Sequence, residues 1–325
     1  MISETQLTLV SDYNLLMDSP PYTPGSTLKI KVSQIDIIVT VEKLFTPFTS
    51  SHVLVVHATS SSAKLPPSHP PLGTPMILKI YDTRYVEDRE AFYSDDRTCF
   101  FPARPWSLEK EQEATAYREA NENWNGTISD EIYMSNPGMV IELELFQKAC
   151  TWWTQEVDAY LALADSPLSG SAVATLYGFG DFISEERRAI VPRILLLEYI
   201  SRSISLDKLK NIKLITPWHI RTLLAASRKL NELGVVHWDL EPRNILLCPD
   251  RVVIIDFGMS TTRVQGGIDM FSDDKWMAKV EACWNEQTVR MMLDKLRGHG
   301  ALVRVALAAN RAVLAHLVQN VEPRK

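Results

Sequence analysis

Short runs of apolar residues dominate the chain between residues 28 and 80. Ile35–Leu44 is rich in isoleucine and valine, and Val53–His57 and Met76–Tyr81 follow as further short runs. Runs of this length and composition are typical of β-strands. The segment between the last two runs, Ser60–Pro75, is dense in serine and proline and predicts a loop. The sequence therefore predicts a β-rich N-terminal region.

A polar segment follows, and after it the chain shows the spacing first of a helix and then of two strands. Residues 82–137 are charge-rich, with a helix-like patch at Ser107–Asn121, and they predict an insertion. Gly138–Ala164 has the spacing of a long helix. Val173–Phe182 and Ile190–Tyr199 again predict strands.

The C-terminal half reads as helical around one hairpin. Thr216-Pro217 predicts the start of a helix that ends before Gly234, because a hydroxyl N-cap and a proline in the first turn favour helix initiation. Ile245–Leu247 and Val252–Ile255 predict a β-hairpin. The residues after Gly258 predict mostly helix, ending in the amphipathic stretch Ala301–Gln319. The order of elements indicates an α+β chain in two lobes.

Composition excludes several classes of protein. Of 325 residues, 46% are hydrophobic and 23% are charged, so the chain can bury a large core. The net charge of −6 and the lack of a dense basic block argue against a nucleic-acid partner. The four cysteines have no C-x-x-C spacing, which favours reduced thiols over a zinc site. We find no signal peptide and no apolar run of membrane-spanning length, so we expect an intracellular, cytoplasmic protein.

Three polar residues flank the predicted hairpin at a fixed spacing. Asn244 follows Asp239 by five positions, and Asp256 ends the second strand. Because a hairpin returns the chain to its starting point, we expect Asp256 to lie near Asp239 and Asn244. Three oxygen-bearing side chains at one place suit Mg²⁺ and a phosphate ester. One carboxylate would then be free to orient a hydroxyl nucleophile.

A buried ion pair is a second candidate feature. Glu156 lies in the middle of the apolar face of its predicted helix, where an unpaired carboxylate costs several kcal/mol. Lys79 is a cation inside an otherwise apolar strand, which makes it the obvious partner. The alternatives are a lysine that faces a sheet edge and a glutamate that reaches water. We favour the pair because of the downstream triplet.

The order of these features carries a resemblance. Along the chain they are Lys79 on a strand, Glu156 on a helix, the Leu195–Ile200 strand and connector, His237-x-Asp239-x4-Asn244, and Asp256-Phe257-Gly258. From about residue 35 to residue 258 the chain resembles the protein-kinase-like phosphotransferases. The long insertion and short tail look like the divergent fungal-type protein-kinase-like family, and they are also similar to aminoglycoside/choline phosphotransferases.

The resemblance implies a bilobal fold. Residues 1–200 would form a β-rich N-terminal lobe with an N-terminal extension and the insertion at 82–137. Residues 201–325 would form a reduced helical C-terminal lobe that carries the catalytic loop.

The resemblance also implies ATP and Mg²⁺ as cofactors. Lys79, anchored by Glu156, would hold the α- and β-phosphates. Asp239 would orient the acceptor hydroxyl of a protein or small molecule, and Asn244 and Asp256 would bind Mg²⁺. Lys79, Glu156, Asp239 and Asn244 form the expected catalytic set.

Further nucleotide contacts are implied at two other places. The connector residues Glu198, Tyr199 and Ile200 would meet the adenine through backbone groups. Thr49 and Ser50 lie where a phosphate-covering loop is expected, and their hydroxyls and backbone N–H groups could contact phosphate. We expect His237 to pack beside the catalytic loop and Gly178-Phe179-Gly180 to be structural.

Departures from the kinase pattern leave a second function open. No G-x-G-x-x-G precedes Lys79. Trp238 stands where regulated kinases carry arginine, and Glu241 stands where Ser/Thr kinases commonly place lysine, although Arg243 could compensate. No Ala-Pro-Glu motif follows Gly258. The alternative function is a pseudokinase, which acts as a nucleotide-binding or scaffolding module.

Overall fold

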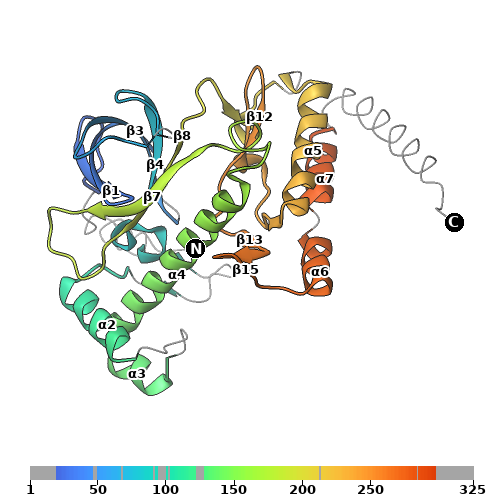
Figure 1. Cartoon of the computed structure of the whole chain (residues 1–325). Coiled ribbons are helices and arrows are strands. Elements are labelled where there is room, and N and C mark those ends of the chain that lie inside the picture. The colour runs from blue at the N-terminus through green and yellow to red at the C-terminus, as the bar shows by residue number, and fades with distance from the viewer. Residues whose placement is uncertain are drawn as a thin grey trace, which may run out of the picture. The chain divides into compact units, whose positions relative to one another are not determined.

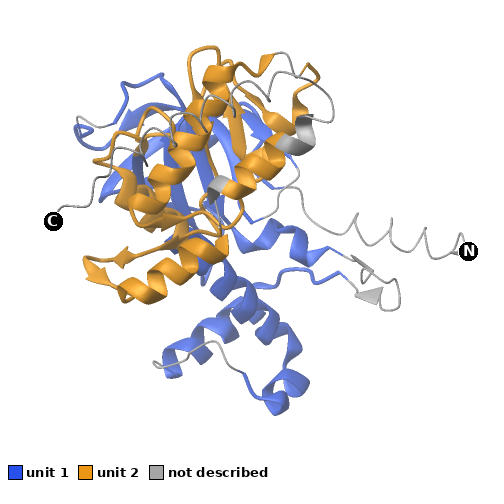
Figure 2. Cartoon of the chain, turned by 90° about the vertical axis from the view of Figure 1, so that its right-hand side faces the viewer, with its two compact units in different colours: residues 1–154, 177–199 blue, residues 155–176, 200–325 orange. Residues whose placement is uncertain are grey.

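The computed structural model describes residues 20–297 apart from 47–49, 67–68, 91, 94–99, 102, 122–127, 212–213 and 284. The chain divides into two compact units (Figure 2). Unit 1 comprises Met1–Thr154 and Tyr177–Tyr199, and unit 2 comprises Gln155–Leu176 and Ile200–Lys325.

A closed barrel of six strands forms the body of unit 1 (Figure 1). In chain order the strands are β1 (Thr27–Val32), β2 (Ile35–Phe45), β3 (His52–Ser61), β4 (Pro75–Tyr81), β7 (Leu176–Ile183) and β8 (Arg193–Glu198). Around the barrel their order is β1-β2-β3-β4-β8-β7. Alternate side chains of these strands point inward and fill the interior, among them Ile30, Val39, Leu54, Leu78 and Leu196. The β-rich N-terminal region is confirmed.

Two glycines allow the barrel to close between β1 and β7. A Cβ atom at Gly180 would lie 1.9 Å from the backbone oxygen of Lys31, and a Cβ atom at Gly178 would lie 2.4 Å from Val32 Cγ1. Any side chain at Gly180 would therefore push the strands apart and break the antiparallel ladder that joins them. The Gly178-Phe179-Gly180 segment has the structural role that we expected.

The insertion adds short elements to unit 1, and a long helix follows it that passes from unit 1 into unit 2 after Thr154. These elements are η1 (Thr83–Tyr85), η2 (Glu87–Arg89), β5 (Phe92–Tyr93), β6 (Phe100–Phe101), α2 (Leu108–Ala120) and α3 (Asp130–Ser135), followed by α4 (Pro137–Leu163). Helix α2 begins after Ser107, whose hydroxyl accepts a hydrogen bond from Lys110 N. Ala114 of α2 packs with Met139, Val140 and Leu143 of α4 in a separate small core. Much of the insertion is thus attached to unit 1 by apolar packing.

Two fully buried carboxylates attach the insertion more firmly. Asp82 accepts hydrogen bonds from Tyr22 Oη at 2.7 Å, from Arg84 Nη2 at 2.8 Å and from Arg188 Nη1 at 3.0 Å. Glu111 of α2 accepts from Arg188 Nε at 3.0 Å, and also from the backbone of Ala189 and Ile190 and from Trp106. Arg188 therefore bridges the two carboxylates. We call Asp82, Glu111, Arg84, Arg188 and Tyr22 the buried charge network.

Burial and charge act in opposite directions on Asp82. Burial alone would raise its pKa, but the guanidinium groups of Arg188 and Arg84 and the Tyr22 hydroxyl outweigh burial and hold the pKa well below its ordinary value. Burial is the main cause that raises the pKa of Tyr22. The network is therefore ionised at aspartate and neutral at tyrosine around neutral pH.

Unit 2 combines helices with short strands. Its helices are α5 (Pro217–Glu232), α6 (Asp273–Cys283) and α7 (Asn285–Arg297), with the turns η3 (Leu206–Lys208) and η5 (Pro242–Asn244). Its strands are β9 (Ile204–Ser205), β10 (Val235–Val236), β11 (Ile245–Leu247), β12 (Val252–Ile254), β13 (Thr261–Thr262), β14 (Val264–Gln265) and β15 (Ile268–Asp269). Helix α5 packs against α7, and β9, β11 and β12 form one small sheet.

Several predicted elements are found at their predicted positions. Helix α5 begins after Thr216, which forms a capping box with His219, and the hairpin β11–β12 is present. One prediction was wrong in part, because β3 extends through Ser60 and Ser61 into the predicted loop. After Gly258 the described residues are mostly helical as predicted, in α6 and α7, with the short strands β13 to β15 before them. The predicted helix at Ala301–Gln319 lies outside the described residues.

The described residues include three of the four cysteines and most of the predicted helices. Cys150, Cys248 and Cys283 form no disulfide, and Cys99 lies outside the described residues. Among the described helices, none combines the length and apolar composition that a bilayer crossing requires.

Candidate active site

The loop between β10 and β11 holds Asp239 and Asn244 together. Asn244 Nδ2 donates to the Asp239 carboxylate at 3.0 Å and to the Asp239 backbone oxygen at 2.9 Å. The turn η5 contains Asn244, and its backbone N–H donates to Glu241 O at 2.9 Å. The separation of five residues therefore closes the loop through the Asn244 amide. With Nδ2 used in this way, Asn244 Oδ1 is the atom left to meet a ligand.

Arg243 lies over the carboxylate of Asp239. Its Nη2 donates to Asp239 Oδ1 at 3.2 Å and Oδ2 at 3.1 Å, and its Nη1 lies 3.1 Å from Glu241 Oε2. The Asp239 side chain is 17% exposed and that of Arg243 is 60% exposed. The carboxylate is therefore separated from solvent mainly by the long side chain of Arg243, which has many rotamers. Hydrogen bonding to Asp239 raises the pKa of Arg243 above its ordinary value.

The β11–β12 hairpin returns the chain to Asn244, as predicted. Ile255 N donates to Asn244 O at 3.0 Å, and Ile245 pairs with Ile254. The next residue is Asp256, whose charge acts on both His237 and Arg243. Asp239, Asn244 and Asp256 therefore belong to one neighbourhood of unit 2. Their roles in catalysis and metal binding remain predictions.

His237 is a packing residue of this loop. It is fully buried, and its Nε2–H donates to Ile255 O at 3.0 Å while its ring lies 4.7 Å from that of Phe257. Burial lowers the pKa of His237, so its ring is neutral at neutral pH. Phe257 in turn packs against Tyr160 of α4 at 5.2 Å. The contacts of His237 and Phe257 thus anchor the loop that carries Asp239 to the buried core.

Two residues of this neighbourhood, Trp238 and Asp256, have a strained backbone conformation. Their φ angles are +59° and +66°, which residues other than glycine rarely adopt. Asp239 N donates to His237 O at 2.8 Å across Trp238, and Trp238 Nε1 donates to Thr261 Oγ1 at 2.9 Å. Each strained residue costs about 1–3 kcal/mol, and such residues cluster at functional sites.

Lys79 and Glu156 are both buried in their own units. Lys79 lies in β4 between Leu195 of β8 and Val53 of β3, and it is 6% exposed. Glu156 is fully buried on the apolar face of α4, which confirms the inward orientation predicted from helical periodicity. Because Lys79 belongs to unit 1 and Glu156 to unit 2, their pairing remains a prediction.

The other predicted nucleotide contacts are placed as follows. Glu198 ends β8 opposite Met76 and is half-buried, as are Tyr199 and Ser50, whereas Ile200 is buried. Thr49 lies outside the described residues. The adenine and phosphate roles of these residues remain predictions.

The donor set at Asp239 suits Mg²⁺ bound together with phosphate. Among the described residues, no three His, Cys, Asp or Glu side chains are grouped as metal ligands. Asn244 and Asp256 offer one amide oxygen and one carboxylate, with Asp239 beside them. Mg²⁺ is usually bound by one or two carboxylates together with phosphate oxygens and water, whereas structural zinc needs four protein ligands.

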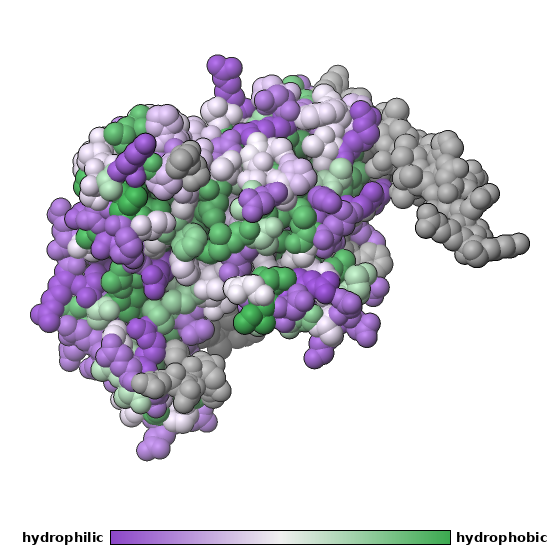
Figure 3. Space-filling model, in the orientation of Figure 1, coloured by the Kyte–Doolittle hydropathy of each residue, from purple (hydrophilic) through white to green (hydrophobic). Residues whose placement is uncertain are grey.

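Sequence reasoning missed an apolar surface that follows the Asp256-Phe257-Gly258 segment. Its members are exposed by 44–68%: Met259, Val264, Ile268 and Met270. Figure 3 shows hydrophobic side chains at the surface in the region of β15. A signal for the hairpin was present, because Gly266-Gly267 lies between Val264 and Ile268 and a pair of glycines favours a two-residue turn.

Comparisons with known proteins support a kinase-like protein. The family model for the RIO domain, an atypical protein kinase domain, matches residues 188–275. This range contains Asp239, Asn244 and Asp256. A stretch of 52 residues is 46% identical to Homeodomain-interacting protein kinase 4 of Homo sapiens, over 13% of this chain and 8% of the human protein. The match thus spans less than a tenth of that relative. The chain is similar to the kinase-like superfamily in the part that contains its candidate active site.

Proposed function

We propose that this protein is an ATP- and Mg²⁺-dependent phosphotransferase that moves the γ-phosphate of ATP to a hydroxyl group. The observation that carries the proposal is the cluster of Asp239, Asn244 and Asp256 around one strained loop. The cluster provides a carboxylate for the acceptor hydroxyl and two oxygen ligands for a metal ion. The similarity of residues 188–275 to the RIO domain supports the same chemistry.

Each residue of the cluster has a distinct task in this proposal. The Asp239 carboxylate orients the acceptor hydroxyl and accepts its proton, and Asn244 keeps the carboxylate in place. Asn244 Oδ1 and the Asp256 carboxylate would hold Mg²⁺, and the bound ion would supply positive charge for the phosphates. Lys79, paired with Glu156, holds the α- and β-phosphates.

Arg243 would act as a removable cover of Asp239. Arg243 donates to both oxygens of the carboxylate that the acceptor hydroxyl would also approach, so an acceptor that takes its place would release the guanidinium. A guanidinium released beside the reacting groups can bind the transferring phosphate, because its planar donors match phosphate oxygens. Glu241 limits how far Arg243 can move, since it holds the other terminal nitrogen.

The apolar surface after Gly258 favours a protein acceptor over a small polar molecule. Met259, Val264, Ile268 and Met270 are exposed and follow Asp256 closely in the chain. Methionine-rich surfaces adapt to varied apolar partners. An acceptor that is a peptide hydroxyl with apolar neighbours would use this surface.

The decisive experiment compares two Asp→Asn variants in a transfer assay with Mg·ATP and a pooled protein extract. Asp239→Asn should lower phosphate transfer by at least about a hundredfold, because it removes the proton acceptor. Asp250→Asn is the matched control: Asp250 is exposed in the β11–β12 turn, so its loss should leave transfer unchanged. Equal transfer by wild type and Asp239→Asn would refute the assigned role.

The alternative is a pseudokinase, and the missing glycine-rich loop is the feature that favours it. It predicts no transfer with any acceptor, together with stabilisation by nucleotide. Mg·ATP at a hundred times its Kd would stabilise the fold by about 2.7 kcal/mol, which a thermal unfolding experiment detects. Stabilisation without transfer would favour the alternative, and neither stabilisation nor transfer would contradict both functions.

A further inference from the structure

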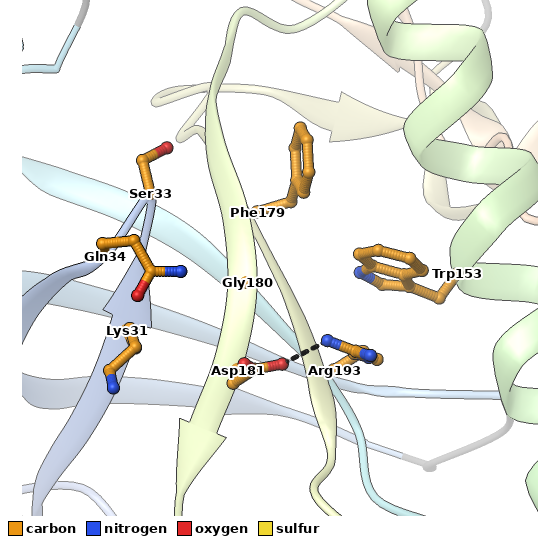
Figure 4. A pocket seen from close by; sticks show the side chains of 8 residues that line it. All are labelled: Lys31, Ser33, Gln34, Trp153, Phe179, Gly180, Asp181 and Arg193. Carbon is orange, nitrogen blue, oxygen red and sulfur yellow. Dashed lines mark hydrogen bonds and ion pairs between the residues drawn. The ribbon is translucent and has the colours of Figure 1, made fainter. Parts of the chain in front are cut away.

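A small cavity lies on the outer face of the barrel of unit 1, among residues that the phosphotransferase site does not use. It has a volume of about 220 Å³. Its lining residues come from β1 and the following turn, from α4, and from β7 and β8: Lys31, Ser33, Gln34, Trp153, Phe179, Gly180, Asp181 and Arg193. In Figure 4, Phe179 and Trp153 lie on one side of β7, and Lys31, Ser33 and Gln34 lie on the other. Gly180 contributes only backbone atoms to the lining.

One wall of the cavity is a rigid aromatic pair. The rings of Trp153 and Phe179 meet edge to face with their centroids 5.9 Å apart. Trp153 Nε1 donates to Ile194 O at 3.0 Å, which fixes the orientation of the indole ring. Both side chains are only half-buried although they are among the largest apolar groups of unit 1. The exposed parts of both rings offer a surface on which a flat apolar group could pack.

Two cations and one carboxylate give the cavity a positive balance. Arg193 lies 5.4 Å from the Trp153 ring centroid, and its Nη1 donates to Asp181 at 2.5 Å. Lys31 Nζ lies 4.0 Å from Asp36, whose other oxygen is held by Lys29 at 2.8 Å. The ammonium of Lys31 is thus weakly neutralised. An incoming anion would meet Lys31 and the outer face of Arg193.

The turn at the rim is strained. Ser33 and Gln34 have φ angles of +47° and +69°, as a two-residue type I′ turn requires, yet neither is glycine or asparagine. Val32 pairs with Ile35, so the register leaves no room for a longer loop. Backbone strain of this kind is common where polar side chains are held for binding. The turn places a hydroxyl and an amide at the edge of the cavity.

We propose that this cavity is a binding site for an aromatic carboxylate. The ring would pack against Trp153 and Phe179, and the carboxylate would lie between Lys31 and Arg193, with hydrogen bonds from the Ser33 and Gln34 side chains. The volume of about 220 Å³ is below that of pockets for drug-sized ligands, so the site would take a ligand no larger than one or two fused aromatic rings. Such a group exists as a free small acid and as an aromatic residue beside a glutamate in a peptide. The site does not depend on phosphate transfer.

The test measures binding of 2-naphthoate to the full chain by saturation-transfer NMR. For a ligand of this size we expect a Kd on the order of 1 mM. The uncharged 2-naphthamide has the same shape and should bind at least about tenfold more weakly. Lys31→Gln and Arg193→Gln should each weaken naphthoate binding by about tenfold, since each removes a charge-assisted contact. Phe179→Leu should weaken naphthoate and naphthamide alike, because it removes the ring wall.

Matched variants control for charge and folding. Lys64→Gln removes the same charge from an exposed loop residue outside the cavity, and Phe45→Leu removes a ring from β2. Both should bind naphthoate within twofold of wild type, and a thermal unfolding curve for each variant should show that it is folded at the temperature of the binding experiment. No binding at 10 mM, equal binding of acid and amide, or equal effects of Lys31→Gln and Lys64→Gln would overturn the proposal.

A peptide separates the two sources of the ligand. We measure binding of the peptide acetyl-Glu-Trp-Glu-amide beside naphthoate. If the peptide binds tenfold more tightly than naphthoate and loses this affinity in Lys31→Gln, the site is supported and its ligand comes from a partner protein. Weaker binding of the peptide beside intact naphthoate binding supports the site with a free small acid as its source.

Discussion

The buried charge network of unit 1 and the Asp239 site of unit 2 are both built from carboxylates and arginines, yet they differ in how completely the charges are satisfied. Asp82 and Glu111 are fully buried and accept hydrogen bonds on both oxygens. Asp239 is partly exposed and shares its oxygens with one flexible arginine and one amide.

The difference shows how carboxylates that stabilise the fold can be told from carboxylates that take part in a reaction. A saturated, buried carboxylate offers no oxygen to a ligand, and removing it leaves several donors buried without an acceptor. A carboxylate held by a mobile side chain can exchange that partner for a substrate at small cost. We therefore expect substitutions in the first group to lower stability and those in the second to lower activity.

The largest expected effect is at Glu111. Glu111→Gln should lower the free energy of unfolding by about 3–5 kcal/mol, because an amide cannot accept from Arg188 and two backbone N–H groups at once. Glu113→Gln on the same helix is the matched control, and since Glu113 is 33% exposed its loss should cost below about 1 kcal/mol. Urea unfolding measures both, and equal losses would contradict the structural role of the network.

Arg243 should show the opposite behaviour. Arg243→Gln should lower phosphate transfer by about a hundredfold, the usual loss when a donor to the reacting groups is removed. Because its side chain is 60% exposed, the variant should unfold like the wild type. Steady-state transfer rates measured beside thermal unfolding test this prediction. A stability loss without a change in kcat would place Arg243 with the structural arginines.

Acid should weaken unit 1 gradually. The folded pKa of Asp82 lies below its ordinary value, so its contribution to stability is present above the unfolded pKa and is lost as pH falls through the folded pKa. One group contributes at most about 1.4 kcal/mol per pH unit. The ¹³C shift of the Asp82 carboxyl should remain that of a carboxylate at pH 3.5. Protonation of Asp82 above pH 4 would contradict the dominance of the two arginines over burial.

The smallest effect concerns the stability of the Asp239 site. Asp239→Asn should change the free energy of unfolding by less than about 1 kcal/mol, because active sites are seldom optimised for stability and water can reach the exposed Arg243 side chain in place of the carboxylate. Asp82→Asn, the same substitution in the saturated network, should cost several times more. Parallel urea titrations of the two variants provide the comparison. A large loss at Asp239 would indicate that it, too, is structural.

Local patterns were sufficient to predict much of this chain. Helix α5 follows from the Thr216 cap, and β11–β12 from two apolar runs around a Pro-Asp turn. The inward orientation of Glu156 follows from helical periodicity. The cluster of Asp239, Asn244 and Asp256 could be predicted because a hairpin brings the three together over only eighteen positions.

Long-range contacts were not predictable in this way. Asp82, Glu111 and Arg188 are far apart in sequence, and each alone looks like an ordinary surface charge. The closure of β1 on β7 depends on two strands about 150 positions apart, and only the glycines of β7 hinted at a close approach. The two-residue strands after Gly258 are too short to show any periodicity, so the sequence predicted only the helices that follow them.

The closed barrel has a consequence for how other proteins can meet unit 1. Open sheets offer unpaired backbone groups along their outermost strands, and peptides or second copies can add a strand there. In the six-stranded barrel every strand has a neighbour on both sides. Other chains therefore cannot associate with this sheet by adding a strand to its edge. The lack of an edge also lowers the tendency of the sheet to form fibrils. Partners of the barrel must recognise its side chains.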